Sequence, residues 1–150
     1  MKKVAVALLV SLLTIVSASA DEISIIGHGF SKHLDNHNFR ERNYGVGLRY
    51  EHDDYGVQIG AYQNSIYKNS VYIGIDWNLI QYQTSTCLKY DAGVYYGAAT
   101  GYTYAVTPVV GLQAAVKCEN VFVRVRAMPE PFYNSKAVGS IEFGLVIKKF

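Results

Sequence analysis

Three histidines and a serine are the side chains best suited to chemistry in this sequence. His33 and His37 lie in a polar stretch near the N-terminus, His28 comes just before it, and Ser65 lies in a second polar stretch. A serine hydroxyl beside a neutral imidazole can attack an acyl group while the histidine accepts the proton. A lone serine or histidine in a loop is usually only solvated. This chemistry therefore requires a fold that brings Ser65 close to a histidine.

The run His33-Leu34-Asp35-Asn36-His37 allows a second chemistry, because imidazole and carboxylate groups also bind divalent metals. Ligands spaced two residues apart in a flexible loop are a weak signal for such a site. We therefore expect no metal and no cofactor.

A two-residue rhythm in the rest of the chain predicts the elements that must position these groups. Between residues 44 and 53, apolar or aromatic side chains alternate with glycines and charged ones, as in a β-strand whose two faces differ. The pattern recurs to give eight predicted strands, at about residues 22–30, 44–53, 55–62, 70–77, 88–97, 106–117, 121–126 and 140–148.

These strands predict an all-β fold, an eight-stranded antiparallel transmembrane β-barrel. A soluble β-sandwich or a lipocalin-like barrel, with the charge-free face as its core, is the alternative. Glycines crowd the polar face, where a narrow lumen needs small residues. Aromatic residues lie near strand ends on the apolar face, as in the girdles of outer-membrane barrels. They are Tyr44, Tyr50, Tyr55, Trp77, Tyr90 and Tyr96. Both observations favour the membrane barrel.

Charged side chains on the polar face would point into the lumen, where an unpaired charge is costly. The basic ones are Arg49, Lys89, Arg124 and Arg126, and the acidic ones are Glu51, Asp76, Asp91 and Glu142. Because the two groups are equal in number, we expect them to neutralise one another inside the barrel.

Residues 1–20 have the basic start, apolar core and small-residue cleavage site of a secretory signal peptide. We expect export through the periplasm, with residues 21–150 forming an outer-membrane barrel that is a monomer. Cleavage takes away two of the 14 basic side chains and leaves 12 against 12 acidic ones, which gives no sign of nucleic-acid binding. A Gram-negative bacterium, or a phage infecting one, is the expected source.

Both termini of such a barrel lie on the periplasmic side, and its longer loops face outward. The expected outer loops are 31–43, 64–69, 101–104 and 128–136, and the inner turns lie near 53–54, 78–86 and 117–120. Cys87 and Cys118 then fall at the periplasmic ends of neighbouring strands, where we expect a disulfide. Two unpaired thiols are the alternative.

Several segments resemble the lipid A palmitoyltransferases, a family of small outer-membrane barrels. They are residues 62–70 continuing to Gly74 and Trp77, residues 39–47, Pro108-Val109-Val110, Met128-Pro129, Tyr133-Asn134 and the terminal aromatic residue. The resemblance implies an enzyme that moves an acyl chain from a phospholipid to lipid A, with both lipids as its partners. The family's catalytic serine falls on Ser65, and its histidine falls on His33, with His28 as second choice.

The resemblance further implies that Pro108 and Pro129 interrupt strand pairing and open lateral access for lipid, since proline cannot donate to the ladder. Two positions depart from the family. Asn64 stands where the family has an aspartate beside the serine, and Asp76 stands where it has a glycine at the floor of the acyl pocket. These departures support the alternative, a non-enzymatic surface barrel that binds a partner, modifies the envelope or excludes superinfecting phage.

Overall fold

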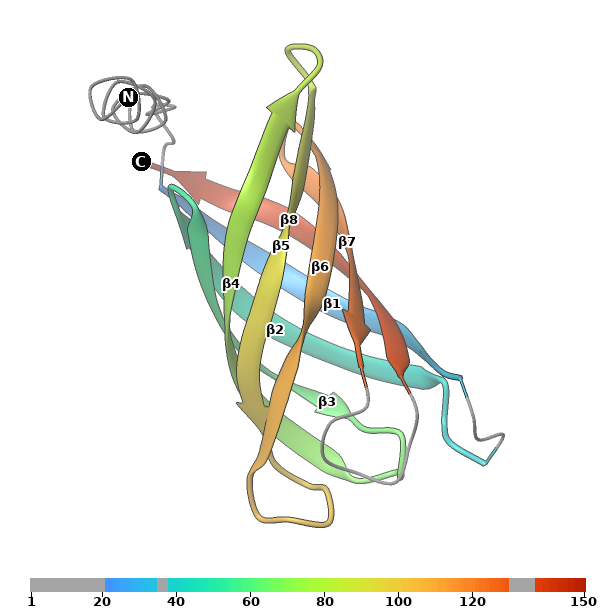
Figure 1. Ribbon diagram of the computed structural model, residues 1–150. Coiled ribbons are helices and arrows are strands. Elements are labelled where there is room, and N and C mark those ends of the chain that lie inside the picture. The colour runs from blue at the N-terminus through green and yellow to red at the C-terminus, as the bar shows by residue number, and fades with distance from the viewer. Residues whose placement is uncertain (1–20, 35–37, 130–136) are drawn as a thin grey trace, which may run out of the picture.

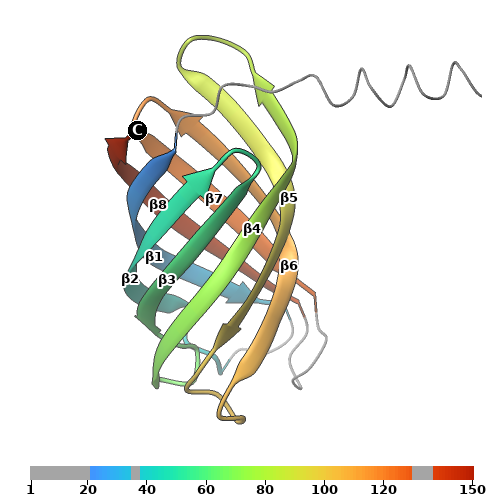
Figure 2. The same ribbon diagram turned by 90° about the vertical axis from the view of Figure 1, so that its left-hand side faces the viewer.

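The computed structural model describes residues 21–34, 38–129 and 137–150, and they form a closed antiparallel barrel of eight strands (Figures 1 and 2). Each strand pairs with the next in sequence, and β1 closes the barrel against β8. The strands are β1 (Glu22–His33), β2 (Arg42–His52), β3 (Tyr55–Gln63), β4 (Asn69–Gln83), β5 (Leu88–Ala99), β6 (Thr107–Cys118), β7 (Val121–Met128) and β8 (Val138–Lys149). The predicted fold class is confirmed. The expected signal peptide, residues 1–20, lies outside the described residues.

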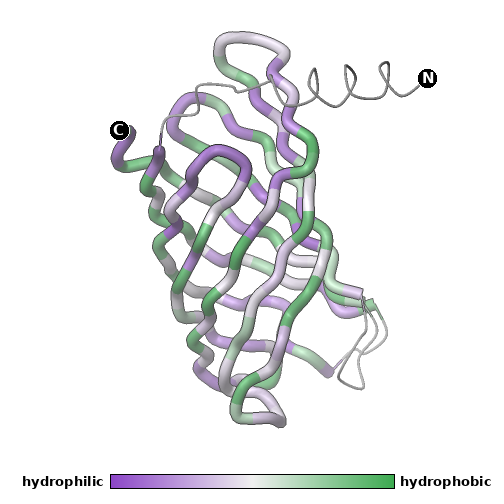
Figure 3. Tube along the Cα trace, turned by 60° about the vertical axis from the view of Figure 1, so that its left-hand side comes forward, coloured by the Kyte–Doolittle hydropathy of each residue, from purple (hydrophilic) through white to green (hydrophobic). Residues whose placement is uncertain are grey.

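Each strand has an exposed apolar face and a buried polar one, and the alternation is visible along the whole tube (Figure 3). On β4, for example, Val71, Ile73 and Ile75 are exposed, whereas Tyr72 and Asp76 are buried. The barrel is therefore inverted relative to a soluble protein, with its charges inside. Within the described residues, no helix is long and apolar enough to cross a membrane.

Glycines on the inner face make room for large luminal side chains, as the alternation predicted. A Cβ added to Gly74 would lie 2.4 Å from the ring of Tyr95, and one added to Gly60 would lie 2.7 Å from the ring of Tyr72. Such contacts are too close for any Cβ atom, so these strand positions accept only glycine while the tyrosine rings stay in place.

The turn predicted near residues 78–86 is wrong, because β4 continues to Gln83. Pairing with β5 resumes beyond a register shift between Asn78 and Ile80, and runs on to Gln83 and Lys89. This hairpin extends beyond the other strands at the end of the barrel that carries both termini (Figure 2). We call this the terminal end, where the Phe150 N–H donates to the Asp21 carbonyl at 2.9 Å. The other is the loop end.

The barrel wall is incompletely paired between β6 and β7 at the loop end. Their ladder runs from Leu112–Ala127 to Cys118–Val121, so β6 residues 107–111 extend beyond it. Pro108 lies in this stretch and pairs only toward Ala98 of β5. We call the place where residues 107–111 face the end of β7 the seam.

Candidate functional site

A cavity of about 420 Å³ occupies the loop-end half of the lumen. Its volume falls in the range of about 300–1,000 Å³ that is usual for small-molecule sites. His28, His33 and Ser65 all line it, as do Pro108 and Pro129. The structure thus brings the expected catalytic groups and both prolines to the wall of one cavity. Asn64 and Asp76 are not among its lining residues.

His33 is the last residue of β1, pairs with Val138 of β8, and is buried. Its ring centroid lies 4.4 Å from that of Phe39. The expectation that His33 lies in a loop is wrong, because β1 extends three residues beyond its predicted end. A strand position fixes the imidazole more firmly than a loop position, which suits a catalytic base.

Ser65 is buried just beyond the end of β3, in the turn that leads to β4. Its carbonyl accepts a hydrogen bond of 2.9 Å from the backbone N–H of Arg40. The Arg40 guanidinium also donates to Gln63. These bonds join the first loop to the second, and so fix the walls that carry His33 and Ser65 relative to each other.

Asn64 has its side chain fully used by four hydrogen bonds. Its amide donates to the Ser70 hydroxyl at 3.0 Å and to the Gly101 carbonyl at 2.9 Å. Its oxygen accepts from the N–H groups of Ile66 at 3.1 Å and Lys68 at 2.9 Å. Through these bonds, Asn64 stabilises the loop that carries Ser65.

His28 lies deeper in the cavity and contacts a tyrosine that sequence reasoning did not single out for chemistry. Its Nε2 lies 2.6 Å from the Tyr72 hydroxyl, and its Nδ1 lies 3.9 Å from Oε2 of Glu142. Nearer the loop end, the hydroxyls of Tyr62 and Tyr102 are 2.7 Å apart. Burial raises the pKa of the Tyr102 hydroxyl, which therefore stays neutral. The alternation places Tyr62 and Tyr72 inside but does not show which luminal groups meet.

Between the cavity and the terminal end the lumen is filled by charged side chains, which we call the lumen cluster. Its members are Arg49, Glu51, Asp76, Arg124, Arg126 and Glu142. All six are buried, and three positive charges meet three negative ones.

Asp76 is fully buried at the centre of the lumen cluster. Its carboxylate pairs with Arg49, and it lies 3.6 Å from Arg124 and 3.3 Å from Arg126. Glu142 accepts from Arg124 at 2.9 Å and from Arg126 at 2.8 Å. Each charge in the cluster thus has a partner of opposite sign, although Nε of Arg124 and Nε of Arg126 make no hydrogen bond, and the cluster forms the inner end of the cavity.

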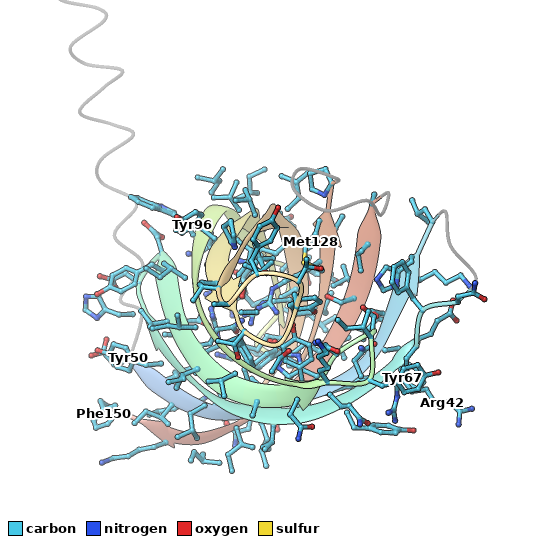
Figure 4. The ribbon with its side chains drawn as sticks, turned by 90° about the horizontal axis from the view of Figure 1, so that it is seen from below. Arg42, Tyr50, Tyr67, Tyr96, Met128 and Phe150 are labelled. Atoms are coloured by element: carbon cyan, nitrogen blue, oxygen red, sulfur yellow. A yellow bond between two sulfur atoms is a disulfide. The ribbon has the colours of Figure 1, made fainter. Side chains whose placement is uncertain are left out.

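The seam connects this cavity with the outer face of the barrel. The lining includes Val110 of β6 and Ile141 of β8, whose side chains are exposed on the apolar outside. It also includes luminal residues such as Tyr95. Figure 4 looks into the loop end and shows Met128, another lining residue, near the opening, whereas Tyr50 and Phe150 lie outside the wall.

At the terminal end, Cys87 and Cys118 form a disulfide with their Cα atoms 4.7 Å apart. It links the turn before β5 to the end of β6. In the part of the chain that the structure describes, no group of three or more metal-binding side chains gathers. His37, and with it part of the histidine run, lies outside that part.

Neither a family model nor a curated protein matches the sequence. Among solved structures, the chain is similar to the N-terminal β-barrel domain of Pseudomonas aeruginosa OprF, at 13% identity and a TM-score of 0.49. The match covers 86% of this chain and 100% of that one. None of these comparisons connects the chain with the lipid A palmitoyltransferases, so that resemblance stays a prediction.

Proposed function

We propose that this chain is an integral outer-membrane barrel whose outer surface meets lipid. Each strand exposes large apolar side chains, which together form a belt around the barrel, whereas soluble monomers rarely expose a contiguous apolar patch larger than a few hundred Å². Examples, one from each strand in order, are Ile25, Leu48, Ile59, Ile73, Val94, Leu112, Val123 and Phe143. A closed barrel also satisfies its backbone hydrogen bonds internally, as a hydrocarbon environment demands. The loop end would then face outward and the terminal end the periplasm.

Within that setting, we infer a lipid acyltransferase that takes an acyl chain from a phospholipid and passes it to lipid A. One observation supports this most: a single cavity is lined by His33 and Ser65 and also by residues of the seam, such as Pro108 and Val110. A lipid chain entering between Pro108 and Pro129 would bring its ester to the wall that carries those two residues. The Ser65 oxygen would attack the ester carbonyl while His33 takes the hydroxyl proton and returns it to the departing lysophospholipid oxygen, which leaves the acyl chain on Ser65. A hydroxyl of lipid A would then attack this ester with His33 again as the base, and Ser65 would regain its proton.

The lumen cluster indicates that the cavity is a closed pocket and that the barrel is not an open channel. Arg49, Asp76 and Arg124 are almost completely buried at mid-barrel, so the lumen is filled at that level. A polar solute therefore has no open path, whereas a lipid reaching the cavity from the side has one.

A transfer assay in reconstituted outer-membrane lipid tests the proposal. Phospholipid carrying an isotope-labelled acyl chain is incubated with the full chain and lipid A, and lipid A mass is followed. We expect label in lipid A with the unmodified protein, and a loss of at least about 100-fold in Ser65→Ala and His33→Ala. Thr86→Ala removes a hydroxyl at the terminal end and serves as the control. Full transfer by Ser65→Ala would overturn the role of Ser65.

A non-enzymatic surface barrel is the second candidate, because Asn64 is committed to its loop and gives Ser65 no carboxylate partner. This barrel would act through its loops on a partner or on phage adsorption. Unchanged lipid A together with reduced adsorption of phage to cells that express the chain would favour it over the enzyme.

A further inference from the structure

The deep wall of the cavity is polar, although a saturated acyl chain would require an apolar one. We define this deep wall by His28, Gln58 and Tyr72, all of which line the cavity. Each has a hydrogen-bonding group among the luminal side chains. Packing hydrocarbon against such groups removes their water and returns no hydrogen bond, which is costly.

Tyr72 has one hydrogen bond left to make. Its oxygen lies 2.6 Å from Nε2 of His28, so one of these two groups donates to the other. If Tyr72 donates, its oxygen still accepts, and if His28 donates, the hydroxyl proton is available to a ligand. Glu142, on the other side of His28, is already occupied by Arg124 and Arg126.

Gln58 contributes a second group beside it. The side chain is 1% exposed, and its oxygen accepts from Nη2 of Arg126 at 3.0 Å, which fixes the orientation of the amide. The amide nitrogen is buried and makes no hydrogen bond of normal geometry. A buried amide N–H group of this kind favours a ligand with an acceptor.

The charged groups at and beneath the deep wall set the kind of group it can take, and Arg126 of the lumen cluster itself lines the cavity. The lumen cluster holds three arginines and three carboxylates and so carries no surplus charge. A carboxylate or an ammonium brought to the wall would unbalance it, whereas an uncharged oxygen would not.

We propose that the deep wall binds an uncharged oxygen on the lipid chain that enters the cavity, so that hydroxylated acyl chains are preferred over plain saturated ones. The inference rests on the proposed function in that a lipid chain occupies the cavity with its ester at the wall that carries His33 and Ser65, which we call the catalytic wall. His28 lies five residues before His33 on β1, which places the deep wall roughly 10–13 Å below the catalytic wall for a tilted strand. The preferred hydroxyl is therefore near the middle of a long chain.

Competition binding with two lysophosphatidylcholines tests this inference on the full chain in detergent micelles. One probe carries a stearoyl chain and the other a stearoyl chain hydroxylated at mid-chain. We expect the hydroxylated probe to bind about fivefold more tightly, as one added buried hydrogen bond would give. Tyr72→Phe keeps the ring and removes the hydroxyl, and should reduce the preference, because only the Gln58 amide is then left to bind the hydroxyl. Tyr96→Phe, on the exposed face of β5, is the matched control and should keep it.

Equal affinity of the two probes for the unmodified chain would overturn the inference without any variant, and would mean that water satisfies the deep wall. A preference of undiminished size in Tyr72→Phe would also overturn it, because Tyr72 supplies the unused hydrogen bond of the deep wall. The outcome is separable from the acyl-transfer proposal. Transfer that depends on Ser65 but ignores chain hydroxylation would leave that proposal standing, and a preference without transfer would leave only the binding inference.

Discussion

Asp76 carries the charge balance of the lumen at the scale of a single residue. Its carboxylate is fully buried and contacts three guanidinium groups, those of Arg49, Arg124 and Arg126. At the floor of an acyl pocket an isolated carboxylate would have been unfavourable. Paired as it is, Asp76 closes the lumen below the cavity and leaves the acyl-transfer proposal intact.

Asp76→Asn should therefore cost stability. The variant leaves three arginines facing two carboxylates, and removing one member of a buried ion network typically costs about 3–5 kcal/mol. We expect a lower urea midpoint for unfolding from lipid vesicles. Asp53→Asn makes the same chemical change at an exposed turn and should shift the midpoint little. Equal midpoints for the two variants would show that the lumen cluster does not hold the barrel together.

A substitution at Asn64 distinguishes a structural role of this residue from a catalytic one. Asn64→Asp restores the acid found in the family that the sequence resembles, but it removes both donors and sets a carboxylate against the Gly101 carbonyl. Leaving such buried groups unsatisfied costs about 1–3 kcal/mol. We expect faster proteolysis of the second loop and lower acyl transfer. Higher transfer by Asn64→Asp would instead show that the carboxylate assists catalysis and that the loop tolerates it.

At the scale of elements, a bulge in β1 decides which histidines share the cavity. His28 and His33 are five residues apart, and in a regular strand they would point to opposite faces. The pairing of β1 with both of its neighbours shifts between His28 and Phe30, and this extra residue returns His33 to the inner face. Alternation alone could not predict this arrangement, because a bulge changes the phase of the pattern.

The glycines of the wall give a prediction for the packing between strands. A Cβ added to Gly144 of β8 would lie 1.9 Å from the Phe122 ring of β7, whereas one added to Gly27 of β1 meets nothing closer than 4.0 Å. Overpacking of this kind costs about 1–3 kcal/mol. Gly144→Ala should lower the unfolding midpoint, and Gly27→Ala should leave it nearly unchanged. Similar midpoints would mean that Phe122 can move aside.

Asp21 links the start of β1 to the end of β2 and predicts a pH effect. Hydrogen bonds from Tyr50, at 2.8 Å, and from His52 hold the pKa of the Asp21 carboxyl below its ordinary value. The stabilisation is present above the pKa of the unfolded chain and is lost as the pH falls through the lower, folded value. NMR titration should give a low midpoint that rises in Tyr50→Phe. An identical midpoint in the variant would contradict the contact.

For the whole molecule, the sequence predicted the number of strands, their closure and the direction of each face, because all three follow from a period of two and from the balance of luminal charges. The sequence did not predict the order in which luminal side chains follow one another along the barrel axis. The height at which Tyr72 meets His28, or Asp76 meets three arginines, depends on the stagger between strands that are distant in sequence. The extended β4–β5 hairpin was not predicted for a related reason, because its pairing continues beyond the register shift between Asn78 and Ile80.

The orientation of the faces predicts how the chain's single tryptophan behaves in a bilayer. Trp77 lies on the exposed face of β4, with 59% of its surface uncovered, so in an outer membrane its indole contacts lipid. In vesicles made with brominated phosphatidylcholine, Trp77 fluorescence should be strongly quenched, because heavy-atom quenching needs contact between bromine and indole. Bromine near the headgroup and bromine deep in the chain, compared in parallel, would give the depth of Trp77. Acrylamide, which remains in water, should quench it weakly in the same vesicles. Strong acrylamide quenching without bromine quenching would show that the apolar face meets water or protein, and the membrane proposal would fall with it.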